Sequence, residues 1–398
     1  MALPTSGTWI GTSVGVGFLI SAAALVAPLR AQDKAVDSTP TSWTYNTQNA
    51  SFRAEIVTAG LQHPVALSPL PGGRMLVADR PTGHSSVLDV TTGALTPVDG
   101  VPPVHGQVDG GLLDVLVHPD YERNGWIYLA YAAPGPDGNA TVVDRARLRG
   151  PNLVDRERLF SARPVVPNSN EFGSRLVLDK GFLYVALGQR NTPAFAQDLG
   201  THPGKIIRVR EDGTVPSDNP FVHEPGALPE IWCYGNRNPV GLAHNPATGE
   251  LWEHEHGPMG GDEVNIIRRG RNYGWPVISY GREYDGRPVG AGITHQAGME
   301  QPIYYYVPDI APSGMIFYTG NAFPAWQGNL FIGALARGHL NRLVIEHDRV
   351  LHEERLLEDR GWRVRAVQQG PDGLIYLGVD AGMIVRLRPV EPAPLRKP

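Results

Sequence analysis

Gly125-Trp-Ile-Tyr-Leu is one of six segments in which a glycine precedes a short apolar run, often with an aromatic residue. The other five are Gly73-Arg-Met-Leu-Val, Gly181-Phe-Leu-Tyr-Val, Gly249-Glu-Leu-Trp-Glu, Gly328-Asn-Leu-Phe-Ile and Gly373-Leu-Ile-Tyr-Leu. Their glycines are separated by 52, 56, 68, 79 and 45 residues. A turn and strand that recur at such intervals are typical of a β-propeller, in which each blade has about four short strands. The repeats predict an all-β fold, a six-bladed β-propeller that occupies residues 53–390.

The composition agrees with one large folded body that contains little helix. The chain has 398 residues, of which 41% are apolar, and its 47 glycines and 36 prolines interrupt any long helical pattern. A two-sheet sandwich or two β-domains are the alternatives, and the regular recurrence disfavours both. The net charge is −5 and basic residues form no block, which argues against a nucleic-acid partner. Cys233 is the single cysteine, so an internal disulfide framework is excluded.

The N-terminal region differs from the rest of the chain. Residues 9–29 contain no charged side chain, and Arg30 and the small residue Ala31 follow them. This pattern predicts that residues 1–31 are a signal peptide or an uncleaved membrane anchor. We expect residues 32–52 to be a linker and residues 391–398 a short tail. The protein is therefore expected to be periplasmic or secreted, or held at the membrane by its anchor.

A polar stretch in the second half of the chain contains candidate metal ligands. Backbone carbonyls around Gly257-Pro258 and the carboxylates of Asp262 and Glu263 are the hard oxygen ligands that Ca²⁺ prefers. His254 and His256 would share one face of a strand, an arrangement that also suits a transition metal. The alternative is that these residues belong to a surface strand and its turn.

Several motifs occur in the order found in a known family. The sequence resembles the soluble glucose and aldose sugar dehydrogenases that depend on pyrroloquinoline quinone (PQQ). These enzymes are six-bladed propellers that bind PQQ and calcium, and the resemblance covers roughly residues 53–390. The matching motifs are Gly110-Gly-Leu-Leu-Asp-Val, Phe172-Gly-Ser-Arg-Leu, Gly204-Lys-Ile-Ile-Arg-Val, Gly235-Asn-Arg-Asn-Pro, Asn272-Tyr-Gly-Trp-Pro and Ile310-Ala-Pro-Ser-Gly.

The resemblance implies positions for two calcium ions and for the quinone. One calcium would bridge the quinone and bind the carbonyls of Gly257 and Pro258. A second, structural calcium would use Glu263 and Tyr273. The quinone would meet side chains of suitable type, and the guanidinium groups among them pair well with carboxylates. These residues are Arg237, Asn238, Arg363 and Arg365.

The sequence also departs from the family pattern at positions that matter for chemistry. Glu171 stands where the family has its catalytic histidine, and Gln189 stands where a carboxylate orients that histidine. The lysine expected near the quinone falls at Ala336, and a glutamine of the family falls at Val240. Asp309 replaces a small hydroxyl residue and adds an anion.

Three functions remain open from the sequence. In the first, the protein is a sugar dehydrogenase that uses PQQ and calcium, with Glu171 as general base and Gln189 as its hydrogen-bonding partner. In the second, the quinone has been lost, and Glu171 and Asp309 form a carboxyl pair for lyase, isomerase or hydrolase chemistry. In both enzymes His256 would be a substrate contact or a second acid/base. In the third, the propeller binds a ligand or partner without catalysis. The substrate of an enzyme of either kind is expected to be sugar-like.

Overall fold

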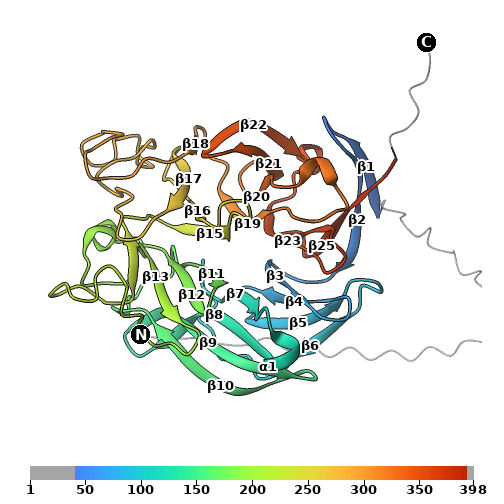
Figure 1. Ribbon diagram of the computed structural model, residues 1–398, viewed down its shortest axis with the longest axis horizontal. Helices are drawn as coiled ribbons and strands as arrows, with labels where there is room; N and C mark the ends of the chain where they lie inside the picture. The colour runs from blue at the N-terminus through green and yellow to red at the C-terminus, as the bar shows by residue number, and fades with distance from the viewer. Residues whose placement is uncertain (1–40, 392–398) are drawn as a thin grey trace, which may run out of the picture. The chain divides into compact units, whose positions relative to one another are not determined.

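The computed structural model describes residues 41–391, which fold into six antiparallel β-sheets arranged radially around one axis (Figure 1). The predicted six-bladed, all-β propeller is thereby confirmed. Within these residues, helical structure is limited to short turns, and no helix has the length and apolar character that crossing a membrane requires. The turns are α1 (Tyr121–Asn124), η1 (Pro193–Gln197), η2 (Pro324–Trp326) and η3 (Glu358–Arg360).

The first three blades each contain four strands that follow one another in the chain. Blade 1 is built from β3 (Pro64–Leu70), β4 (Arg74–Asp79), β5 (His84–Asp89) and β6 (Leu95–Val98). Blade 2 is built from β7 (Leu112–Val117), β8 (Trp126–Gly135), β9 (Gly138–Arg149) and β10 (Asn152–Ser161). Blade 3 is built from β11 (Gly173–Asp179), β12 (Phe182–Leu187), β13 (Lys205–Arg210) and β14 (Ile231–Tyr234).

Blades 4 and 5 repeat this arrangement, whereas blade 6 has five strands. Blade 4 is built from β15 (Pro239–His244), β16 (Leu251–Glu255), β17 (Asp262–Ile267) and β18 (Tyr304–Tyr306). Blade 5 is built from β19 (Pro312–Phe317), β20 (Leu330–Ala334), β21 (His339–Glu346) and β22 (Arg349–Leu356). Blade 6 is built from β23 (Val364–Gln369), β24 (Ile375–Val379), β25 (Met383–Pro389), β2 (Ser51–Ala59) and β1 (Ser42–Asn46).

Blade 6 closes the ring, because it joins strands from the two ends of the described chain. β2 pairs with β25 in a register that sets Phe52 opposite Pro389, and β1 forms the outer edge. The linker prediction is therefore wrong from residue 42 onward. Alternate residues of β1 are exposed, so its sequence is polar and resembles a linker. The predicted signal or anchor, the first part of the predicted linker and residues 392–398 of the predicted tail lie outside the described residues.

The six repeat glycines have a common structural role. Each lies in the turn before the second strand of a blade, and each has a positive φ, between 70° and 81°. Residues with a Cβ rarely adopt this conformation. The apolar run that follows each glycine is buried between neighbouring blades, as Ile127 and Leu129 of β8 are. The repeat therefore encodes a tight turn followed by a core strand.

The inner strands surround the axis and position the loops at one end of it. β3, β7, β11, β15, β19 and β23 contact one another in this order, and β23 contacts β3 to complete the circle. Adjacent blades pack through apolar clusters, so the ring is held by side chains rather than by backbone pairing between blades. The loops that precede the inner strands gather at one end of the axis.

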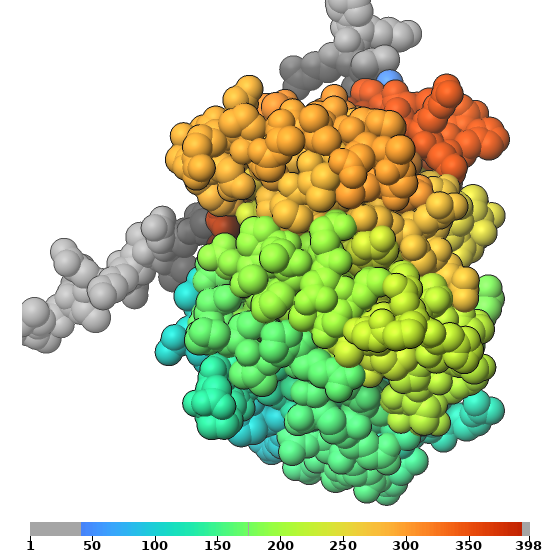
Figure 2. Space-filling model, turned by 90° about the vertical axis from the view of Figure 1, so that its left-hand side faces the viewer, coloured from blue at the N-terminus to red at the C-terminus, as the bar shows by residue number. Residues whose placement is uncertain are grey.

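Blade 4 carries an extended connection on its outer side. Residues 268–303, between β17 and β18, form much of the orange mass at the top of Figure 2. The connection is fixed by the ring of Tyr280, which stacks 3.9 Å from the ring of Tyr305 in β18. Its backbone also pairs at Arg282 with Met259, in the loop that contains the predicted calcium ligands.

Candidate active site

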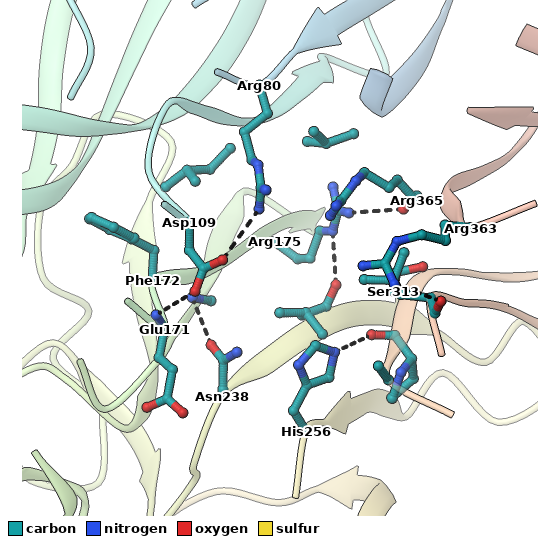
Figure 3. A pocket seen from close by; sticks show the side chains of 17 residues that line it. Arg80, Asp109, Glu171, Phe172, Arg175, Asn238, His256, Ser313, Arg363 and Arg365 are labelled. Carbon is teal, nitrogen blue, oxygen red and sulfur yellow. Dashed lines mark hydrogen bonds and ion pairs between the residues drawn. The ribbon is translucent and has the colours of Figure 1, made fainter. Parts of the chain in front are cut away.

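A cavity of about 260 Å³ lies at the end of the axis where the inner strands begin (Figure 3). Every blade contributes to its wall through an inner strand. The residues that do so are Val65, Leu113, Gly173, Val240, Ser313 and Arg365. A site built in this way requires the complete ring, since no single blade encloses it.

The wall of the cavity is unusually rich in arginine. Arg80, Arg175, Arg363 and Arg365 line it, together with the carboxylate residues Asp109 and Glu171 (Figure 3). Several cations around one partly enclosed space favour an anionic ligand.

Sequence reasoning missed three of these residues: Arg80, Asp109 and Arg175, the last of which lies inside a matching motif. The Arg80 side chain is 18% exposed, its Nε is buried without a hydrogen-bond acceptor, and its Nη1 lies 3.9 Å from Asp109 Oδ1. Burial and the neighbouring Arg365 lower the pKa of Arg80 to about 10. The available signal was position: Arg80 directly follows β4, and Asp109 directly precedes the Gly-Gly-Leu-Leu motif.

Glu171 forms an ion pair with Arg237. Glu171 Oε1 lies 2.8 Å from Arg237 Nη2, and the two side chains are only 12% and 9% exposed. Glu171 Oε2 accepts hydrogen bonds from the amide group of Gln189 and, at 3.1 Å, from the backbone N–H of Asn191. Gln189 thus lies against the Glu171 carboxylate, which is the contact expected from the sequence.

The backbone at Glu171 is held in a left-handed turn. Its φ is 51°, a value that residues with a Cβ rarely adopt. The N–H of Glu171 donates to Asp109 Oδ2 at 3.2 Å, and its carbonyl accepts from the N–H of Arg190 at 3.4 Å. Asp109 therefore helps to hold the turn that presents Glu171.

Arg237 connects Glu171 with the predicted calcium loop. Its Nη1 donates to the carbonyls of His256 and Gly257, each at 3.0 Å, and its guanidinium carbon lies 5.2 Å from the ring centre of Trp275. The backbone N–H of Arg237 donates to Glu255 Oε2 at 2.7 Å. Arg237 is thus a buried cation that contacts one of the carbonyls assigned to calcium by resemblance.

The other predicted quinone-binding residues, Asn238, Arg363 and Arg365, also line the cavity. Asn238 lines it and accepts the N–H of Gly173 on Oδ1 at 3.1 Å. Arg363 and Arg365 lie on the opposite side from Glu171, and the Glu171 side chain points away from them (Figure 3). Their carboxylate partner is Asp380. Arg365 therefore shares the cavity with Glu171 without contacting its carboxylate.

His256 lines the same cavity in a defined tautomer. Its Nε2 lies 2.6 Å from the carbonyl of Pro312, so Nε2 carries the proton that makes this bond. Burial lowers the pKa of His256, which favours the neutral ring. His254 is buried as well, and its ring packs against Gly241. Burial lowers the pKa of His254 to about 3.

Asp309 is not among the residues that line the cavity. One of its carboxylate oxygens accepts the N–H of Gly260, and the other is buried without a partner. Burial and the neighbouring Asp262 raise the pKa of Asp309. The structure therefore does not bring Asp309 and Glu171 together as an acid–base pair.

Three of the four predicted calcium residues line a second, very small cavity. This cavity measures about 10 Å³, roughly the space of one water molecule. Gly257, Glu263 and Tyr273 line it together with Arg237 and Glu255, and Pro258 directly follows Gly257.

Glu263 and Tyr273, the residues predicted for the structural calcium, differ in the partners that their side chains have within the protein. Burial and the neighbouring Asp262 raise the pKa of Glu263 to about 8, so without a cation this carboxyl group is protonated at neutral pH. The Tyr273 hydroxyl donates to the carbonyl of Ile266 at 2.7 Å and accepts the N–H of Arg268 at 2.8 Å. It is therefore fully used within the protein. No cluster of three His, Cys, Asp or Glu side chains in residues 41–391 is arranged to hold a metal.

The fold and the site define a class: a six-bladed propeller with an arginine-lined cavity on its axis. The chain belongs to the family described as Glucose / Sorbosone dehydrogenase, whose profile matches residues 61–386.

Named relatives agree with this assignment. Over 347 residues the chain is 41% identical to aldose sugar dehydrogenase YliI of Escherichia coli, covering 85% of this chain and 94% of that protein. The crystal structure of the soluble aldose sugar dehydrogenase of Escherichia coli, in its apo form, superimposes with a TM-score of 0.81 at 41% identity, covering 85% of this chain and 99% of that one. The PQQ-bound aldose sugar dehydrogenase of Streptomyces coelicolor superimposes with a TM-score of 0.69 at 26% identity, covering 86% of this chain and 99% of that one.

Proposed function

We propose that this protein is an aldose dehydrogenase that binds PQQ in the arginine-lined cavity and Ca²⁺ beside it. Glu171 is the group that accepts the substrate's hydroxyl proton. The observation that supports this role is the anchoring of the Glu171 carboxylate at the cavity wall by Arg237, Gln189 and Asn191.

The chemistry of the cavity fits a polycarboxylate such as PQQ. Arginines pair well with carboxylates, and four of them line the wall. Arg80 Nε is buried without an acceptor, so this cation has unused capacity for a ligand. Arg363 and Arg365 share the single carboxylate of Asp380, which leaves an excess of positive charge on that side of the cavity. A named relative with this fold binds PQQ.

Two carboxylates that line the small second cavity, Glu255 and Glu263, support the proposal of a hard cation there. Glu253, Glu255 and Glu263 are buried near one another, and burial raises the pKa of each. Arg237 is the cation that contacts this group, through its bond to Glu255. A divalent ion held by carboxylate and carbonyl oxygens would compensate for the burial that raises these pKa values. If the ion binds the Gly257 carbonyl, Arg237 Nη1 must give up part of its bond there.

In this account the bound quinone supplies the acceptor for the hydride of the sugar. The residues of the chain bind and orient the sugar, and they accept the proton of its hydroxyl group. The ion pair with Arg237 holds the Glu171 carboxylate in one place, and Gln189 fixes its second oxygen. The neutral His256 presents Nδ1 as a hydrogen-bond acceptor, because Nε2–H is bound to Pro312. This arrangement positions a proton acceptor and leaves an imidazole for a substrate hydroxyl.

PQQ binding tests the proposal. PQQ and Ca²⁺ are added to the purified protein, and bound quinone is measured by its absorbance and by the reduction of a dye with aldoses. We expect saturable binding and aldose-dependent dye reduction. Absence of both with an intact fold would contradict the proposal and would favour a redox-free enzyme or a binding propeller on the same scaffold.

A further inference from the structure

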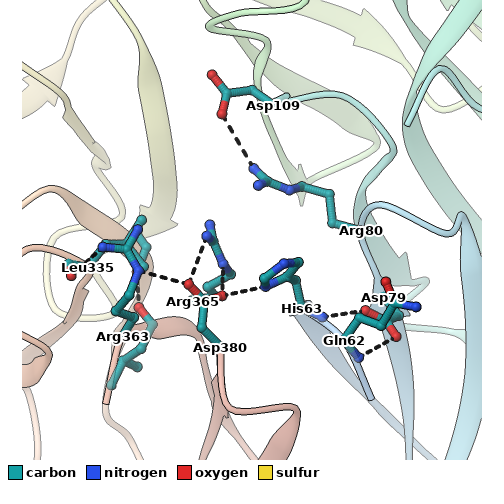
Figure 4. Close-up of polar contacts among 11 residues, drawn as sticks. Gln62, His63, Asp79, Arg80, Asp109, Leu335, Arg363, Arg365 and Asp380 are labelled. Atoms are coloured by element: carbon teal, nitrogen blue, oxygen red, sulfur yellow. Dashed lines mark hydrogen bonds and ion pairs between the residues drawn. The ribbon is translucent and has the colours of Figure 1, made fainter. Parts of the chain in front are cut away.

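One carboxylate holds both arginines on the far side of the cavity. Asp380 lies in the turn between β24 and β25, and its N–H donates to the carbonyl of Arg363 at 3.0 Å (Figure 4). Its Oδ2 accepts Arg363 Nε and Arg365 Nη2, each at 2.9 Å. Its Oδ1 accepts Arg365 Nε and lies 2.8 Å from His63 Nδ1. These four residues are called the Asp380 hub.

The Asp380 hub decides which edges of the guanidinium groups face the cavity. Arg365 uses Nε and Nη2 on Asp380, and Arg363 uses Nε on Asp380 and Nη1 on the carbonyl of Leu335 at 2.9 Å. The remaining donors, Arg365 Nη1 and Arg363 Nη2, are left for a ligand. Arg363 directly precedes β23, Arg365 lies near its start, and both side chains line the cavity. Without a shared anion the two cations would repel each other.

Residues outside the Asp380 hub also hold it in place through hydrogen bonds. The N–H groups of Gln62 and His63 donate to the carboxylate of Asp79 at 2.8 and 2.6 Å, which holds His63 against Asp380 (Figure 4). The N–H of Arg80 donates to the carbonyl of His63 at 3.1 Å. The same network therefore links blade 6 with blade 1 and reaches a third arginine of the cavity.

Asp380 keeps its negative charge at ordinary pH. Its side chain is 16% exposed, and burial by itself would raise its pKa. The hydrogen bonds and charge of Arg365, with the bonds of Arg363 and His63, outweigh burial and lower the pKa of Asp380 to about 2. The hub is therefore permanently charged under conditions in which a ligand would bind.

We propose that Asp380 is a positioning residue that presents Arg363 and Arg365 to the carboxylates of the ligand in the cavity. The inference rests on the proposed function, in which this ligand is PQQ. Asp380 does not contact the ligand, and it acts by fixing the geometry of the two guanidinium groups. None of the sequence motifs includes it, and it lies 15 residues after Arg365.

A positioning role and a purely electrostatic role of Asp380 predict opposite changes in the affinity for the ligand, so the two can be distinguished. Removal of the Asp380 charge makes the cavity more positive, so a purely electrostatic effect would tighten the binding of an anion. A positioning effect weakens binding, because the arginines lose the partner that orients them. Asp380→Glu separates the two further, since it keeps the charge and moves the carboxylate.

The experiment measures the Kd of PQQ by calorimetry in the presence of Ca²⁺, for the wild type and the Asp380→Asn and Asp380→Glu variants. We expect a rise in Kd of about tenfold or more in both variants. Asp218→Asn is the matched control, because Asp218 pairs with Arg208, and its side chain is 66% exposed outside the cavity wall. It is expected to leave Kd unchanged. Thermal melting verifies the fold, and if Asp380→Asn does not fold, Asp380→Glu alone decides.

The outcomes are distinct. Unchanged or tighter binding in a folded Asp380 variant, with a wild type that binds PQQ, overturns the positioning role and leaves the proposed function in place. A wild type that does not bind PQQ overturns the proposed function and with it this assignment of the ligand.

Discussion

Glu171 and Arg237 face each other across 2.8 Å in a nearly buried ion pair, although they belong to different blades and are 66 residues apart. The pair joins the turn that precedes β11 with the loop that precedes β15. It gives the Glu171 carboxylate at the cavity a fixed cationic partner. The consequences for catalysis and stability differ, and each is open to measurement.

Replacement of Glu171 tests its chemical role. Glu171→Gln keeps the shape of the side chain but removes the basic oxygen, so turnover should fall by roughly 10²–10⁴-fold. The melting temperature reports whether the fold is intact. Glu157→Gln is a matched control, because Glu157 also pairs with an arginine, Arg145. The Glu157 side chain is 50% exposed. Undiminished turnover in folded Glu171→Gln would rule out Glu171 as the proton acceptor.

Replacement of Glu171 by histidine asks whether the family's base works in this site. If the protein uses PQQ, Glu171→His restores an imidazole and should retain measurable PQQ-dependent dehydrogenase activity. Gln189 would orient the new ring poorly, because its neutral amide binds an imidazole less strongly than a carboxylate would. Activity is measured by aldose-dependent dye reduction. A folded variant that binds PQQ but has no activity above that of Glu171→Gln would contradict the expectation.

Removal of the cation tests the energetic role of the ion pair. Arg237→Met leaves the Glu171 carboxylate buried and unpaired, a change that typically costs about 3–5 kcal/mol. Denaturant unfolding should show a loss of this order. The double variant with Glu171→Gln removes both charges, so it should be more stable than the sum of the two single losses. Strict additivity would show that the pair does not couple in solution.

Calcium removal should change the pH dependence of stability. Burial and Asp262 raise the pKa of Glu263 to about 8 from its ordinary value of 4.5. Between these values the folded state binds a proton that the unfolded state has lost, so the stability of the calcium-free protein falls as pH rises. The slope for one such proton is at most about 1.4 kcal/mol per pH unit. Melting curves recorded in chelator from pH 5 to 8 measure it.

The controls for this pH experiment are saturating Ca²⁺ and the Glu263→Gln variant. Bound metal replaces the proton, and the amide cannot titrate, so both should flatten the slope that Glu263 contributes. A slope that is the same with chelator, with Ca²⁺ and in Glu263→Gln would remove Glu263 from the metal site.

The repeat glycines can be tested one at a time. Gly328 has a φ of 76°, and an added Cβ would meet no atom within 4 Å, so the cost of Gly328→Ala is one of backbone conformation. We expect a loss of roughly 1–2 kcal/mol in denaturant unfolding. Gly135→Ala is the control, since Gly135 lies outside the positive-φ set and its nearest atom would be 3.5 Å away. Equal stability of the two variants would refute this reading of the repeat.

The sequence predicts the fold well because the repeat is local. A glycine with positive φ and the apolar strand after it lie next to each other in the chain, so six copies of one pattern disclose six blades. The repeat does not predict β1, because β1 is an edge strand with alternate exposed residues. Its place in blade 6 depends on β2, whose partner β25 lies at the other end of the described chain.

The site is predictable only in part, because it is assembled from all six blades. Arg237 lies inside a matching motif and Glu171 directly precedes one, whereas Arg365 is placed only by the family resemblance. Arg80 and Asp380 belong to no such motif, and their importance follows from contacts between blades 6 and 1 that form when the ring closes. The position of Asp309 in the sequence does not reveal that its carboxylate binds Gly260 and that the residue does not line the cavity.

The central claim, that the arginine-lined cavity holds PQQ for sugar oxidation with Glu171 as proton acceptor, is tested most directly by one titration. PQQ is titrated into the wild type and Glu171→Gln with saturating Ca²⁺, and bound quinone and aldose-dependent dye reduction are recorded on the same samples. The account predicts that both proteins bind the quinone and that only the wild type turns over aldoses at an appreciable rate. A wild type that binds no quinone, or a Glu171→Gln variant that turns over as fast as the wild type, would contradict it.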